Sequence, residues 1–104
     1  MSLSAEELAI LQTVERCTSA SSTAFSKCAA VLRAMAEPNS SWSEAQENAV
    51  CNSGYEDTEI GRLYDAIRDL AARGYLAGRG DLTSPAGPRY TECGLTDAGR
   101  AAIP

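Results

Sequence analysis

The sequence predicts a mainly α-helical domain that ends in a small β-hairpin. Apolar residues recur at helical spacing in several separate segments before residue 74. The period changes after that residue, where short strand-like segments alternate with turns rich in glycine and proline. A chain of 104 residues suits one domain with one core, so we expect a single domain over residues 1–104.

Residues 1–56 are expected to form the N-terminal helices. The first helix begins with Ser4 as N-cap and Glu7 three residues later, which is the capping-box pattern, and the run "TSASST" ends it. The second is predicted over residues 23–36, before Pro38, and a shorter third helix over residues 43–51. The apolar stripe of the second helix consists of Phe25, Cys28, Ala29, Leu32, Met35 and Ala36.

Residues 57–76 contain the strongest amphipathic pattern in the chain, "TEIGRLYDAIRDLAARGYL" from residue 58 onwards. Asp57 or Thr58 can cap the start of this helix, and Gly74 stands where a left-handed residue ends it. Its inward stripe consists of Ile60, Leu63, Tyr64, Ile67, Leu70 and Ala71.

The last third of the chain is predicted to form a hairpin and one short helix. "YLAGRG" and "PRYTEC" are the expected strands of a hairpin over residues 75–94, and "DLTSPAG" supplies its turn. Thr96 is the expected N-cap of a terminal helix over residues 96–103.

Charge is distributed unevenly along this acidic chain, whose net charge is −5. Residues 1–59 hold three basic and nine acidic side chains, a net charge of −6. Residues 60–104 hold six arginines and five acidic side chains, a net charge of +1. Nucleic-acid binding relies on cations that neutralise phosphates, so any basic surface is expected in the second half.

Two segments, in this order of elements, resemble the winged helix–turn–helix domain of PadR- and MarR-like transcriptional regulators. "GRLYDAIRDLAARGYL" is similar to their recognition helix, and "RY" followed by "LTDAGRAA" is similar to the end of their wing and the run after it. The sequence departs from that family in placing four residues, "TECG", between Tyr90 and Leu95 and in lacking the long C-terminal helix. A homodimer would therefore use the N-terminal helices.

The resemblance implies a small protein that binds double-stranded DNA and regulates transcription. Thr58 and Arg62 would lie on the outward face of the recognition helix, which enters the major groove. Arg79 and Arg89 on the wing would contact phosphates or the minor groove. The N-terminal run "MSLSAEELAI" has no basic segment and carries two glutamates, so we expect no signal peptide and a cytoplasmic protein.

An alternative is an acidic winged-helix-like module that binds a protein, such as an antirepressor, a DNA mimic or an inhibitor of a nucleic-acid-handling complex. Asp65 and Asp69 lie one turn apart on the face that would meet DNA, where they repel phosphates. They can also pair with neighbours, Asp65 with Arg62 or Arg68 and Asp69 with Arg73. The residues assigned to partner binding in this alternative are Glu44, Glu47, Glu56, Asp57, Asp65 and Asp69.

Residue types argue against an enzyme, a metal site, a cofactor site or a membrane protein. The chain has no histidine and no phosphate-binding glycine loop, and no apolar run approaches the roughly 18–20 residues of a membrane span. The four cysteines, Cys17, Cys28, Cys51 and Cys93, form no C-x-x-C pair. We expect them to act as small buried hydrophobic residues, with a redox pair of Cys17 and Cys28 as the alternative.

Overall fold

The computed structural model describes residues 3–35, 59–83, 85 and 89–104. In this part of the chain the protein is mostly helical, with one three-stranded antiparallel sheet. The elements in order are α1 (Ala5–Ser21), β1 (Ser26–Lys27), α2 (Cys28–Met35), α4 (Glu59–Ala72), β2 (Leu76–Asp81), β3 (Arg89–Leu95) and α5 (Asp97–Ala102). The third helix predicted over residues 43–51 lies outside the described residues.

Helix α1 begins as predicted and ends later than predicted. The Ser4 hydroxyl accepts a hydrogen bond from the Glu7 N–H, and the Glu7 carboxylate accepts one from the Ser4 N–H, so the capping box is confirmed. The helix then continues through the predicted break to Ser21. The hydroxyl of Thr18 donates to the carbonyl of Val14 at 2.9 Å, so this polar side chain is satisfied inside the helix.

The predicted start of the second helix at residue 23 is wrong. Ser26 and Lys27 form a short strand instead, pairing with Cys93 and Glu92 of β3, and α2 begins only at Cys28. Backbone groups of residues 26 and 27 thus bond to a distant strand, which sequence periodicity does not reveal. Of the apolar stripe predicted for this helix, Cys28 and Leu32 lie in the core, whereas Phe25 precedes the helix and is not part of the core.

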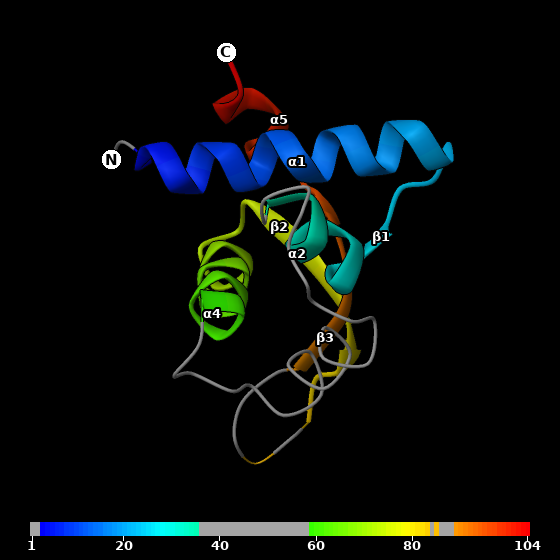
Figure 1. Ribbon diagram of the computed structural model, residues 1–104, viewed down its shortest axis with the longest axis vertical. Coiled ribbons are helices and arrows are strands. Elements are labelled where there is room, and N and C mark those ends of the chain that lie inside the picture. The colour runs from blue at the N-terminus through cyan, green and yellow to red at the C-terminus, as the bar shows by residue number, and fades with distance from the viewer. Residues whose placement is uncertain (1–2, 36–58, 84, 86–88) are drawn as a thin grey trace.

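The sheet has the strand order β1-β3-β2, so the predicted hairpin forms its larger part. Strands β2 and β3 pair from Leu76–Leu95 to Asp81–Arg89, with a bulge between Arg79 and Gly80. In Figure 1, α1 runs across the upper part of the molecule, with α5 above it. Helices α2 and α4 lie below α1, and the hairpin of β2 and β3 runs downward, away from α1.

One hydrophobic core joins the helices to the sheet. It includes three residues of α1, three of α2 and four of α4, together with one residue from each long strand. These residues are Ile10, Leu11, Val14, Cys28, Val31, Leu32, Leu63, Tyr64, Ile67, Leu70, Leu76 and Cys93. The predicted inward stripe of α4 is therefore confirmed where the structure describes its side chains.

Candidate functional site

The end of α4 directs the chain into the hairpin. Gly74 has a φ of +87°, a left-handed conformation that favours glycine. Its N–H donates to the Ala71 carbonyl at 3.1 Å, and the Tyr75 N–H donates to the Leu70 carbonyl at 3.0 Å. This is the Schellman arrangement, in which one glycine satisfies the last carbonyls of a helix. The predicted stop at Gly74 is confirmed, and β2 follows after a single further residue.

Tyr64 of α4 joins the helix directly to the hairpin. Its side chain is fully buried, and its hydroxyl donates to the Tyr90 carbonyl at 2.9 Å while accepting from the Tyr90 N–H at 2.7 Å. Strand β1 pairs with β3 only at Cys93 and Glu92 and does not reach Tyr90. One phenol therefore satisfies both backbone groups that a third strand would otherwise pair, and it holds α4 and the hairpin together.

The "LTDAG" run is a second tie between the same elements. The Thr96 hydroxyl donates to the Gly74 carbonyl at 2.6 Å and accepts from the Gly99 N–H at 3.1 Å. A β-carbon at Gly99 would lie 2.1 Å from the Tyr75 carbonyl oxygen, so only glycine lets α5 approach this closely. Thr96 is the N-cap that was predicted, and this run has a structural role at the base of the hairpin.

The arginines on the outer side of α4 form ion pairs with α1. Nη1 of Arg62 lies 2.7 Å from both carboxylate oxygens of Glu6. Arg73 forms an ion pair with Glu7 and a second one with Asp69 at 3.0 Å. Both arginines thus reach the first turn of α1, although Arg62 lies near the start of α4 and Arg73 directly follows its last residue, 11 positions later.

The two aspartates of α4 make the pairs at three and four positions that the spacing predicted. Asp69 pairs with Arg73, and Asp65 lies 3.6 Å from Arg68, one of its two predicted partners. With Ala72 and Tyr90, these side chains of Asp65, Arg68 and Asp69 line a small hollow of about 260 Å³ between α4 and the hairpin. The side of α4 that borders this hollow therefore presents two carboxylates as well as a guanidinium group.

Capping and ion pairing act together on Glu7 and Arg73. The pKa of Glu7 is lowered, first because its carboxylate accepts the Ser4 N–H and next because it accepts a hydrogen bond from Arg73. The pKa of Arg73 is raised by hydrogen bonds first to Asp69 and then to Glu7. Glu7 and Arg73 are therefore both charged at neutral pH.

The predicted wing arginines have different surroundings. The guanidinium of Arg79 lies over the Phe25 ring, 3.7 Å from its centroid, in a cation–π contact. Arg89 begins β3 opposite Asp81 and is half-buried. The structure thus places Arg62 beside α1, Arg79 against the segment before β1, and Arg89 near the hairpin turn. Thr58, Glu44, Glu47, Glu56 and Asp57 lie outside the described residues.

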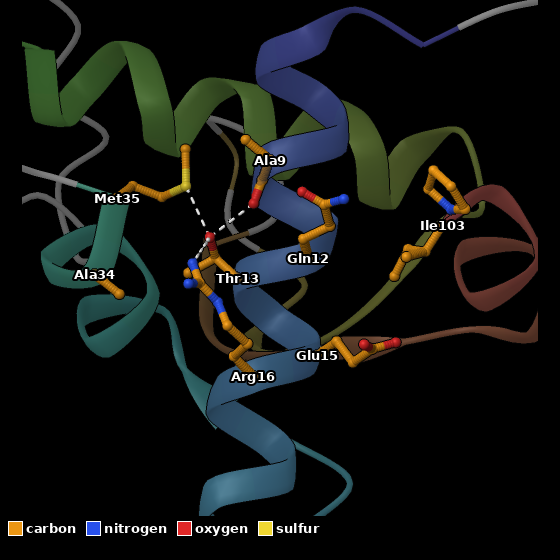
Figure 2. Close-up of a pocket in the computed structure, with 9 residues that line it drawn as sticks. Ala9, Gln12, Thr13, Glu15, Arg16, Ala34, Met35 and Ile103 are labelled. Carbon is orange, nitrogen blue, oxygen red and sulfur yellow. Dashed lines mark hydrogen bonds between the residues drawn. The ribbon is translucent and has the colours of Figure 1, made fainter.

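A larger open groove of about 560 Å³ lies along α1, between the end of α2 and the residues after α5 (Figure 2). Buried Thr13 forms its base, and the Thr13 hydroxyl donates to the Ala9 carbonyl at 2.7 Å and accepts from Arg16 at 3.2 Å. The same hydroxyl lies 3.1 Å from the Met35 sulfur. The polar groups of this base are therefore satisfied within the protein.

Cysteines Cys28 and Cys93 are buried in the core, whereas Cys17 is half-buried. All three are free thiols. Within the described ranges, no group of three or more acidic or thiol side chains is placed to hold a metal ion. No helix of that same part of the chain is long and apolar enough to cross a membrane.

Sequence reasoning missed four residues that shape this site. Glu6 and Phe25 were not assigned to the charged face. Tyr64 was placed only in the inward apolar stripe, and Tyr90 only in the motif that resembles the end of the wing. Each makes a contact with a residue at least 26 positions away. The only local signal was the acidic first turn of α1.

No family model, curated protein or solved structure matches the chain at a significant level.

Proposed function

We propose that this chain is a small winged-helix protein that binds double-stranded DNA and regulates transcription. The observation that carries the proposal is the double hydrogen bond between Tyr64 and Tyr90, which presents α4 and the hairpin as one unit. A helix for the major groove and a neighbouring hairpin for the backbone are the two parts that such binding requires. The strand order β1-β3-β2, with α4 directly before the hairpin, is compatible with a winged helix.

In this proposal α4 faces the major groove and the hairpin lies along the backbone. Arg62, near the start of α4, contacts a phosphate or a base edge. Arg79 and Arg89 contact phosphates or the minor groove, and the Phe25 ring preorganises Arg79 by holding its guanidinium. Recognition resembles that of PadR- and MarR-like regulators.

Fluorescence anisotropy with a labelled random duplex tests this proposal. Binding is expected at low salt and should weaken steeply as salt rises, because each phosphate contact releases counterions. Arg79→Ala and Arg89→Ala should each weaken binding and reduce the salt slope by about one contact. Arg100→Ala on α5 removes the same charge away from the hairpin and serves as the control. Absence of salt-sensitive binding, or an equal effect of all three variants, contradicts the proposal.

A second candidate function is binding of a basic protein surface. The observation that favours it is the pair Asp65 and Asp69 on the outer side of α4, where two of the arginines are ion-paired to α1. An acidic surface of this kind suits an antirepressor, a DNA mimic or an inhibitor of a nucleic-acid-handling complex.

The double variant Asp65→Asn and Asp69→Asn separates the two functions. Removing two negative charges should strengthen duplex binding several-fold if α4 meets DNA. The same variant should weaken capture of a basic protein partner if α4 meets protein. The double variant Glu15→Gln and Asp97→Asn is the matched control, since it removes two negative charges from exposed sites outside α4.

A further inference from the structure

We infer that Glu6 is an internal competitor for the DNA phosphate that Arg62 would bind, so that α1 restrains duplex binding by α4. This inference rests on the proposed DNA-binding function. A carboxylate and a phosphate offer a guanidinium the same kind of acceptor, namely two oxygens that share a negative charge. The described contact is of this kind, with one Arg62 nitrogen 2.7 Å from each Glu6 oxygen.

The position of α1 makes the competition direct. Helix α4 lies beside the N-terminal half of α1 (Figure 1), and Arg62 reaches across to the first turn of α1. The two residues lie 56 positions apart in the chain, so the fold itself places this carboxylate at the arginine. A phosphate approaching Arg62 therefore meets a site that a carboxylate already occupies.

Solvent exposure distinguishes the ion pair Arg62–Glu6 from the ion pair Arg73–Glu7. The Arg62 and Glu6 side chains are 57% and 39% exposed, whereas those of Arg73 and Glu7 are 27% and 20% exposed. Glu7 also closes the capping box of α1, and Arg73 binds Asp69 as well. The ion pair Arg73–Glu7 thus holds the two helices together. The ion pair Arg62–Glu6 is the one in which a phosphate can replace the carboxylate, because exposed ion pairs are weak.

The test is duplex binding by Glu6→Gln, which keeps the size of the side chain and removes its charge. Affinity should rise by about two- to five-fold, the range set by one exposed ion pair. The salt slope should steepen by up to about one phosphate contact, because Arg62 then engages DNA without competition from Glu6. Glu15→Gln is the matched control, since it removes the same charge from an exposed position of α1 at the groove of Figure 2.

A double-mutant cycle completes the experiment. In a chain that already carries Arg62→Ala, Glu6→Gln should raise the affinity for the duplex no more than Glu15→Gln does in that same chain. Equal gains for Glu6→Gln and Glu15→Gln in the native background would show a net-charge effect and overturn the inference while leaving the proposed function standing. If neither the native chain nor Glu6→Gln binds duplex with salt sensitivity, both fail. Circular dichroism and urea midpoints establish that each variant is folded.

Discussion

At the scale of single residues, one buried hydroxyl connects the helix and the hairpin on which the proposed function depends. The Tyr64 phenol both donates to and accepts from the backbone of Tyr90. The Tyr90 ring in turn covers Gly78, where a β-carbon would lie 2.1 Å from the ring. The position of the hairpin relative to α4 therefore depends on specific polar and steric contacts as well as on apolar packing.

Tyr64→Phe is expected to lower the free energy of unfolding by about 1–3 kcal/mol, because the Tyr90 N–H and carbonyl lose their partner. Urea denaturation measures this change, and amide hydrogen exchange at Tyr90 should accelerate. Tyr75→Phe is the control, since the described residues include no hydrogen bond to the Tyr75 hydroxyl, and it should change stability by less than about 0.5 kcal/mol. Equal effects of the two variants would contradict the role assigned to Tyr64.

Two glycines with positive φ should respond differently to alanine. At Gly74 a β-carbon meets nothing within 4 Å, so Gly74→Ala carries only the cost of the left-handed backbone, about 1 kcal/mol. At Gly80, with φ at +145°, a β-carbon would lie 2.3 Å from the Arg89 carbonyl oxygen. Gly80→Ala should therefore cost more, about 2–3 kcal/mol. Paired urea melts compare them, and the reverse order would contradict the structure.

At the scale of elements, α1 and α4 are joined by charge as well as by apolar packing. In the first turn of α1, Glu7 caps its own helix and also binds Arg73, which directly follows α4. The same turn supplies Glu6 to Arg62. A local capping motif thereby also sets how the two helices pair.

Acidification should weaken this link. The pKa of Glu7 in the folded protein lies below its ordinary value of 4.5. The ionised Glu7 therefore contributes its full stabilisation of the fold above pH 4.5, and this stabilisation is lost as the pH falls through the folded-state pKa. The melting temperature of the native chain should therefore exceed that of Glu7→Gln at neutral pH, and the difference should disappear in acid. Thermal melts between about pH 3 and 7 measure it, with Glu15→Gln as the control. A difference that does not change with pH would contradict the assignment.

At the scale of the whole molecule, a single core predicts one cooperative unfolding transition. Cys28 of α2 and Cys93 of β3 both belong to that core, whereas Cys17 is half-buried at its edge. Their reactivity therefore reports on opening of the entire structure rather than on chemistry at a site.

Thiol labelling followed by mass spectrometry tests this cooperativity. Among the three cysteines that the structure describes, Cys17 should react first. Cys28 and Cys93 should react slowly and at similar rates, because both require global opening. Tyr64→Phe should accelerate labelling of the two buried thiols by the factor that its loss of stability predicts. Much faster labelling of Cys93 than of Cys28 would instead indicate separate opening of the hairpin.

The sequence by itself determined the features that depend on near neighbours. The Ser4–Glu7 capping box, the stop at Gly74, the Thr96 cap and the inward stripe of α4 all follow from hydrogen bonds or spacings within a few residues. The aspartate–arginine pairs at three and four positions on α4 belong to the same class.

Only the tertiary structure decided the features that join distant residues. Strand β1 exists because Ser26 and Lys27 pair with β3, which moves the start of α2 from residue 23 to Cys28. The links Tyr64–Tyr90 and Arg62–Glu6 span 26 and 56 positions. Periodicity and capping rules describe a chain and its near neighbours, whereas these contacts form only when packing brings separate elements together. For the same reason, the pattern of α4 alone does not reveal that Arg62 is ion-paired to α1.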